Sequence, residues 1–198
     1  MMVEPAALES RRTRRAAGFF FLALMLSAGA GFSGGARQDL EPILVSVKSA
    51  EGAYELDSSF NVRVSSAKAW EVLSDYEHIG EFVPFIKESV VEGRGNGHVY
   101  VRQLAVGKFW FFSRNIAILL DVEERSPESI IFQDIAYRDF ESYHGYWKID
   151  ALDPNECLVH YHLTVNPSFA MPPFASKGLF RSNIQDLVDQ VRAEMLHR

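Results

Sequence analysis

The chain has 198 residues, of which 47% are hydrophobic and 13% aromatic, so it can form one ordinary globular domain but not two large ones. Its single cysteine excludes an internal disulfide framework and any metal site built from several cysteines. The 26 acidic residues outnumber the 20 basic ones, and the net charge of −6 argues against a nucleic-acid-binding protein.

The first thirty residues have the three parts of a secretory signal peptide. Four arginines between positions 11 and 15 precede an uncharged apolar run, 16–30, which ends in Ala28-Gly29-Ala30. The run is shorter than the ~20 residues that span a bilayer, so a permanent N-terminal membrane anchor is the weaker interpretation. We therefore expect an exported protein, periplasmic or extracellular. Removal of residues 1–30 leaves 16 basic and 24 acidic residues, a net charge of −8.

A flexible linker is expected after the signal peptide, because residues 31–36 read GFSGGA. No second linker and no internal repeat follow. The sequence therefore divides into a signal peptide (1–30), a linker (31–51) and one ligand-binding domain (52–198).

The domain begins with a strand and a short helix. From Tyr54 to Val64, mostly apolar residues alternate with polar ones, which predicts a strand with one face buried. Ser65-Ser66 offers an N-cap for a helix that reaches about Tyr76.

Short alternating segments then indicate an antiparallel meander. Asn96-Gly97 is a strong hairpin-turn signal, and further breaks are placed at Gly107-Lys108, Ser126-Pro127 and Arg138-Asp139. In the last segment Cys157 and the apolar residues point one way, and the histidines the other. We expect these segments at 85–92, 98–106, 109–124, 129–137, 140–149 and 157–165.

The C-terminal segment predicts one long amphipathic helix of roughly 22 residues, with its apolar residues at helical spacing. This stripe consists of Phe180, Ile184, Leu187, Val188, Val191 and Met195. The fold class is therefore α+β, with a curved antiparallel sheet of about seven strands wrapped on a long C-terminal helix. A broad sheet covered by one helix favours a cavity between them.

This order of elements resembles the START-like superfamily (Bet v 1-like, SRPBCC, helix-grip fold), and within it the polyketide cyclase/dehydrase and coenzyme Q-binding group. The resemblance covers about residues 52–198 and is most specific at 64–76 (VSSAKAWEVLSDY) and Phe82-Val83-Pro84-Phe85-Ile86. Gly145-x-Trp147 and Tyr161-x-Leu163 support it. None of these motifs is catalytic, and the resemblance implies an apolar ligand held in the cavity.

We assign to the wall or mouth of this cavity a set of mostly aromatic residues and two mid-strand arginines. An arginine there could hold a ligand carbonyl or carboxylate, although an outer-face position is an equal alternative for each. No catalytic residue, metal or cofactor is assigned. The set is Trp70, Phe82, Pro84, Phe85, Arg102, Phe112, Arg114, Tyr143, Trp147, Tyr161, Phe174, Phe180 and Ile184.

Two polar groups could carry other chemistry. His160-x-His162 has the spacing of two metal ligands on one strand face, but no acidic third ligand follows from the sequence. Asp134, Asp139 and Glu141 surround one hairpin, and burial could make such carboxylates a general acid and base. We interpret the histidines as solvent-facing sheet residues and do not assign the carboxylates to catalysis.

Two apolar stretches stand out beyond the core. In the run 109–112 (FWFF), strand alternation would send two aromatic residues to each side of the sheet. The stretch 169–174 holds Phe169, Met171 and Phe174, and in the resembling family this region borders the cavity mouth. Exposed apolar residues there would let the protein touch a bilayer transiently without a basic surface.

The sequence thus predicts an exported, monomeric protein that binds a quinone, isoprenoid or lipid. The interpretation favours binding over catalysis. One alternative is a cyclase or dehydratase that uses Asp134 or Arg102 with Tyr143 or Tyr161. The other is an interaction module that uses the aromatic run 109–112.

Overall fold

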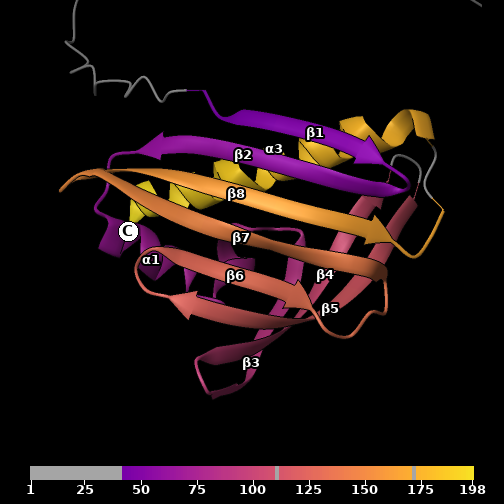
Figure 1. Cartoon of the computed structure of the whole chain (residues 1–198), viewed down its shortest axis with the longest axis horizontal. Helices are drawn as coiled ribbons and strands as arrows, with labels where there is room; N and C mark the ends of the chain where they lie inside the picture. The colour runs from indigo at the N-terminus through magenta and orange to yellow at the C-terminus, as the bar shows by residue number, and fades with distance from the viewer. Residues whose placement is uncertain (1–41, 110–111, 171–172) are drawn as a thin grey trace, which may run out of the picture. The chain divides into compact units, whose positions relative to one another are not determined.

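The computed structural model describes residues 42–109, 112–170 and 173–198, and the side chains of 108, 109, 112 and 173–176 lie outside this description. The predicted signal peptide and residues 31–41 of the predicted linker lie outside it too. The described strands are β1 (Leu44–Ala50), β2 (Ala53–Val62), β3 (Ile86–Gly95), β4 (His98–Phe109), β5 (Phe112–Arg125), β6 (Ser129–Asp134), β7 (Phe140–Asp153) and β8 (Glu156–Pro167) (Figure 1). The helices are α1 (Ser66–Leu73), α2 (Ile79–Phe82) and α3 (Pro173–His197).

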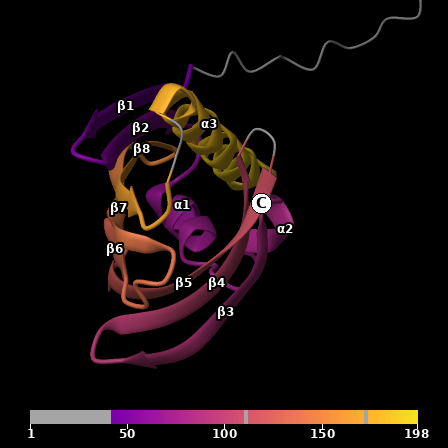
Figure 2. The same ribbon diagram turned by 90° about the vertical axis from the view of Figure 1, so that its right-hand side faces the viewer.

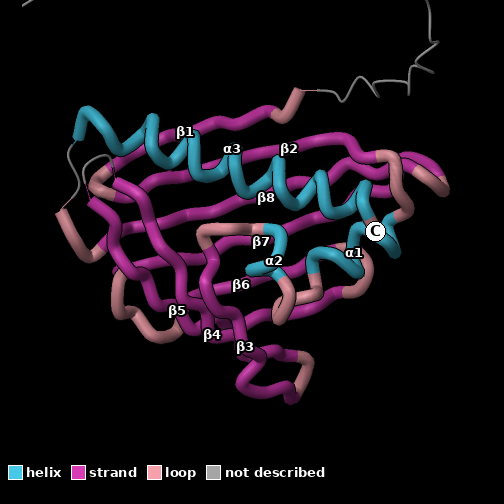
Figure 3. Tube along the Cα trace, turned by 180° about the vertical axis from the view of Figure 1, so that it is seen from behind, coloured by secondary structure: helices cyan, strands magenta, loops and turns pink. Residues whose placement is uncertain are grey.

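All eight described strands form one antiparallel sheet in the order β1-β2-β8-β7-β6-β5-β4-β3. Figure 2 shows that the sheet curves strongly from β1 round to β3, with α1 inside the curve. The three helices lie on this concave face (Figure 3). The predicted α+β fold with a curved sheet and a long C-terminal helix is therefore confirmed. No helix among the described residues is long and apolar enough to cross a membrane.

The C-terminal part of the predicted flexible linker (31–51) is not a linker, because Leu44–Ala50 forms the strand β1. Its residues pair with β2, with Val45 opposite Ser58 and Val47 opposite Leu56. Glu51 and Gly52 join the two strands with φ of 52° and 87°, as a two-residue hairpin turn with two left-handed residues requires. This hairpin adds the eighth strand to the about seven that were expected.

Strand alternation separates the two faces of the sheet as predicted. On β8, Cys157, Val159, Tyr161, Leu163 and Val165 are buried on the concave face. His160 and His162 alternate with them and belong to the convex face. The buried Cys157 thiol is part of the core, and burial raises its pKa to about 11, so it is no activated nucleophile.

Local signals predicted the start of α1, the helix α3 and the tight turn, whereas α1 ends at Leu73 and not at about Tyr76, and α2 was not predicted. Ser65 caps α1, and its hydroxyl accepts a hydrogen bond from the Lys68 N–H at 3.3 Å. Asn96 and Gly97 have φ of 54° and 82° in the β3–β4 turn, as predicted. The predicted stripe of α3 faces the core, with Phe180 and Leu187 partly buried and the others fully buried: Ile184, Val188, Val191 and Met195.

The break predicted at Gly107-Lys108 is wrong. β4 continues to Phe109, and Gly107 pairs with Arg114 while Phe109 pairs with Phe112. Phe109 and Phe112 therefore form the last described pair of the β4–β5 hairpin, and residues 110–111 lie outside the described part of the chain. The interaction-module alternative depends on the side chains of this run, which lie outside the described residues, so it stays a prediction.

Gly145 lets β7 and β8 pack closely beneath an aromatic side chain. A Cβ atom at this position would lie 2.0 Å from the His162 carbonyl oxygen and 2.9 Å from Cζ of Phe132. Only a residue without Cβ fits there. The Gly145-x-Trp147 motif therefore reflects a steric requirement of the sheet.

We predict that Gly145→Ala lowers the free energy of unfolding by about 3 kcal/mol, because backbone and ring must both move to admit the methyl group. Urea denaturation measures the change. Gly95→Ala is the matched control, since a Cβ at Gly95 meets nothing within 4 Å. Equal stability of the two variants would contradict the steric explanation.

Candidate functional site

The concave faces of β6, β7 and β8 carry a continuous aromatic wall. The ring of Phe132 lies 6.0 Å from that of Tyr143 and 6.3 Å from that of Tyr161. Trp147 contacts Tyr161 at 4.3 Å, and Phe140 contacts Tyr143 at 5.1 Å between ring centroids. Alternation directs Tyr143, Trp147 and Tyr161 to the same side, and Phe132 lies opposite Gly145 on that side. The irregularity between Phe140 and Ser142 brings Phe140 to this side as well. We call these five residues the aromatic wall.

Part of this concave surface remains accessible to solvent. The long helix α3 packs against β1 and β2 and touches α1 and α2, so it covers one side of the curve. Tyr143, Trp147 and Ile116 keep partial exposure although they face inward, as does Leu187 on α3. A small molecule can therefore contact apolar side chains here without unpacking the buried core.

Two tyrosine hydroxyls place a polar pair within the aromatic wall. Burial raises the pKa of Tyr143 to about 12, although a hydrogen bond with Tyr161 opposes the shift. Burial also raises the pKa of Tyr161, and the neighbouring Tyr143 adds to it. Both phenols are therefore neutral at physiological pH. They can exchange hydrogen bonds with a ligand but cannot act as bases there.

Other polar groups lie inside the curve, and sequence reasoning missed them. Gln103 on β4 donates through Nε2 to the Ser89 hydroxyl on β3 at 3.2 Å, and both side chains are buried. Ser58 on β2 lies opposite Tyr161, and its buried hydroxyl has no hydrogen-bond partner among the described residues. Strand alternation, which puts these polar residues on the inward face, was the sequence signal that could have identified them. A buried hydroxyl without a partner is a candidate contact for a polar ligand group.

Arg102 is not a cavity residue. Its Nε lies 2.7 Å from Glu92 and its Nη1 lies 2.8 Å from Glu88, both on the neighbouring strand β3. Its own strand buries Val101 and Gln103 on the opposite, concave face. The prediction that Arg102 binds ligand inside the cavity is therefore wrong, because alternation places it on the convex face.

Arg114 lies near the end of the β4–β5 hairpin, and its side chain contacts the connection before β7 and the connection after β8. Its guanidinium lies 2.8 Å from the Asp139 carboxylate and 4.5 Å from the centre of the Phe169 ring. Asp139 precedes β7, and Phe169 follows β8. Arg114 is thus engaged within the protein, so it does not offer a free guanidinium as the sequence had suggested.

Asp134 and Asp139 accept hydrogen bonds from backbone N–H groups at the place where β6 ends beside the longer β5. Asp134 is buried and accepts hydrogen bonds from the N–H groups of Leu119, Ala136 and Tyr137. Asp139 accepts one from Ala117 at 2.9 Å. The two carboxylates satisfy N–H groups that a continued β6 would have paired. The strand predicted to reach Tyr137 therefore stops at Asp134.

The remaining predicted wall residues lie at several depths. Trp70, Phe82 and Phe85 are partly buried and pack against the core. The Phe180 ring contacts the Tyr54 ring in a tilted arrangement with centroids 4.5 Å apart, and Ile184 is buried. Pro84 is exposed just before β3. The side chains of Phe112 and Phe174 lie outside the described part of the structure.

Comparison with known families now places the chain. The sequence profile described as polyketide cyclase / dehydrase and lipid transport matches residues 62–192. The chain belongs to this family. A comparison with curated protein sequences gave no match.

Solved structures of family-like proteins share the fold at low sequence identity. A START superfamily protein from Mycobacterium smegmatis aligns with TM-score 0.61 and 17% identity, over 72% of this chain and 97% of that chain. The Zhui aromatase/cyclase from Streptomyces sp. R1128 aligns with TM-score 0.61 and 14% identity, over 74% and 95%. A STAR-related lipid transfer protein from Xanthomonas axonopodis aligns with TM-score 0.62 and 14% identity, over 80% and 96%.

The Arg114–Asp139 pair generates a pH-dependent prediction. Burial alone would raise the pKa of Asp139, but hydrogen bonds from Ala117 and Arg114 hold it below its usual range. Its contribution to stability is therefore present above the usual carboxyl pKa and lost as the pH falls through the lowered one. We expect Arg114→Gln to lower the free energy of unfolding by about 1 kcal/mol at pH 7 and to start acid unfolding at a higher pH.

Acid titration followed by circular dichroism measures this shift, and Arg102→Gln is its matched control. Arg102 pairs with exposed glutamates on the convex face, where ion pairs contribute little. An unchanged acid midpoint in Arg114→Gln, or an equal shift in Arg102→Gln, would count against the stabilising role of the pair.

Proposed function

We propose that this protein is exported and binds a hydrophobic small molecule between its sheet and α3. The observation that carries the proposal is the aromatic wall, whose inward-facing Tyr143 and Trp147 stay partly exposed although α1 and α3 cover other parts of the concave face. Burial of ~400 Å² of apolar ligand surface would contribute about 10 kcal/mol before the losses of binding. No catalytic residue is required for such binding.

The polar groups inside the curve suit a ligand with a polar end. A quinone carbonyl, a fatty-acid carboxyl or an isoprenoid alcohol could form a hydrogen bond with Tyr143 or Tyr161, or with Ser58. The apolar remainder would lie against the aromatic wall. Family membership supports this class of ligand, since the family description includes lipid transport.

The enzymatic alternative has less support from the site. It required Asp134 or Arg102 to act with a tyrosine inside the cavity. Arg102 pairs with glutamates on the convex face, and Asp134 accepts three backbone hydrogen bonds. The tyrosine pair alone offers neutral hydroxyls, which favour binding over proton abstraction.

Export rests on the signal-peptide pattern of residues 1–30. The chain would then act as a monomer in the periplasm or outside the cell, with no nucleic-acid partner. Exchange of ligand with a bilayer would involve transient contact through the ends of the cavity near Phe169. These are features of the same proposal.

Ligand capture is tested by native mass spectrometry of the full chain purified from its expression host under non-denaturing conditions, followed by titration of the emptied protein with a prenylated benzoquinone and with oleic acid. We expect a co-purifying hydrophobic molecule or micromolar or tighter binding of one of the two. Protein that carries nothing and binds neither compound would contradict the proposal.

We further expect Trp147→Leu to weaken binding about tenfold, because it removes ~60 Å² of apolar contact from the aromatic wall. Isothermal titration calorimetry measures the affinity. Tyr100→Leu is the matched control, since Tyr100 is an exposed aromatic residue on the convex face of β4. Equal losses in both variants would place the ligand elsewhere.

A further inference from the structure

The convex face of β2 and β8 gathers three potential metal ligands that are far apart in sequence. Glu55 and Asp57 are two residues apart on β2 and therefore share one face. Asp57 lies directly opposite His162 of β8 in the strand register. One oxygen of each carboxylate and one ring nitrogen of His162 lie within 4.8 Å of one another. We call Glu55, Asp57 and His162 the convex triad.

The imidazole of His162 is held in one orientation by three neighbours. Its Nδ1 lies 2.8 Å from Asp57 Oδ1, and its Nε2 lies 3.3 Å from the Thr164 hydroxyl. The Tyr146 ring stacks on it with centroids 5.2 Å apart and an interplanar angle of 20°. A hydrogen-bonded second nitrogen is the usual arrangement around a metal-binding histidine, because it fixes ring and tautomer.

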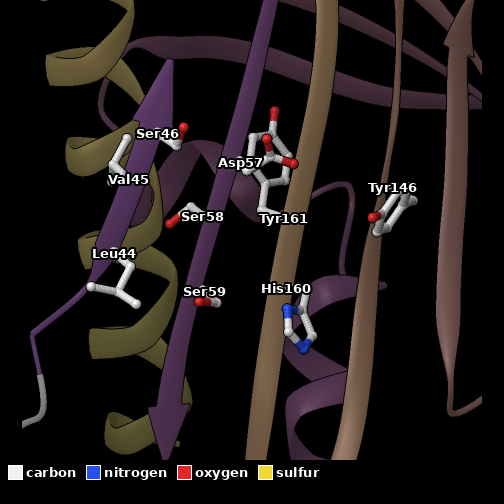
Figure 4. A pocket seen from close by; sticks show the side chains of 9 residues that line it. All are labelled: Leu44, Val45, Ser46, Asp57, Ser58, Ser59, Tyr146, His160 and Tyr161. Atoms are coloured by element: carbon white, nitrogen blue, oxygen red, sulfur yellow. The ribbon is translucent and has the colours of Figure 1, made fainter. Parts of the chain in front are cut away.

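The triad lies beside a pocket of about 270 Å³, which Asp57 lines while Glu55 and His162 do not. Asp57 belongs to both, and Tyr146, which stacks on His162, also lines the pocket. Figure 4 shows Asp57 on β2, His160 on β8 and Tyr146 on β7 around this pocket. Three protein ligands beside an open space leave coordination positions for water or for an oxygen of a small ligand.

The charge at this position favours a cation. Two carboxylates face one imidazole, and Asp57 forms no ion pair with a lysine or arginine in the described part of the chain. Lys48 lies opposite Glu55 on β1, but the two residues form no ion pair within the described ranges. The triad therefore combines net negative charge with one nitrogen ligand.

We propose that the convex triad binds a divalent transition-metal ion, with Zn²⁺ as its representative. One imidazole nitrogen and two carboxylate oxygens form a ligand set that suits Zn²⁺ better than Ca²⁺ or Mg²⁺, which prefer oxygen alone. The ion replaces the proton between His162 Nδ1 and Asp57, and that proton goes to solvent. The site is on the opposite face from the aromatic wall and does not depend on ligand binding there.

Calorimetric titration of the full chain with ZnCl₂ tests the site, with thermal unfolding of each variant as the check on folding. We expect one equivalent of Zn²⁺ to bind and to raise the melting temperature of the natural protein. His162→Gln and Asp57→Asn should each weaken binding tenfold or more while the metal-free protein melts as before. Loss in both variants with an intact fold supports the proposal.

His98→Gln is the matched control. His98 Nδ1 lies 2.6 Å from Asp121, so it forms the same kind of histidine–aspartate pair on a strand. Within the described residues, only the convex triad brings a third ligand within reach. Zn²⁺ affinity should be unchanged in this variant. No binding by the natural protein, full binding by His162→Gln, or an equal loss in His98→Gln would each overturn the proposal.

Discussion

The apolar concave face of an eight-stranded sheet has one long helix to cover it, and this mismatch shapes the rest of the molecule. The helix α3 buries its stripe mainly against β1 and β2, at one side of the curve. A flat sheet would leave the other strands open to water, so strong curvature is needed to enclose them. Within the aromatic wall on β6, β7 and β8, Tyr143 and Trp147 keep partial exposure, while Phe132, Phe140 and Tyr161 are buried.

The ends of strands explain why acidic residues that suggested catalysis are structural. β5 has 14 residues and β6 has six, so part of one edge of β5 has no strand beside it. Asp134 and Asp139 supply acceptors for the Leu119 and Ala117 N–H groups there. Arg114 neutralises Asp139 and links this connection to Phe169. Burial of these carboxylates thus follows from the backbone's need for acceptors.

The two faces of the same strands have different chemistry. On β8, Tyr161 contributes to the aromatic wall while the neighbouring His162 contributes to the convex triad. Each face can be altered with limited effect on the other, because successive side chains point to opposite sides. The proposed hydrophobic ligand and the proposed metal ion therefore use different side chains, on opposite faces of the same sheet.

Much of this arrangement could be predicted from local pattern. Alternation on β8 identified Tyr161 as inward and His162 as outward, and helical spacing identified the stripe from Phe180 to Met195. The resemblance to START-like proteins at residues 64–76 then identified the fold. β1 escaped detection because it follows a glycine-rich stretch and buries its apolar residues only in part.

The sequence by itself determined which residues share a face, because periodicity and turn preference are properties of neighbouring residues. Only the tertiary structure decided which partner each side chain meets. Arg102 and Arg114 both looked like mid-strand arginines, yet one pairs with glutamates outside and the other with Asp139 at the hairpin end. Asp57 and His162 lie 105 positions apart and meet because of the β2–β8 register. Such contacts depend on strand order and register, which the local sequence pattern does not specify.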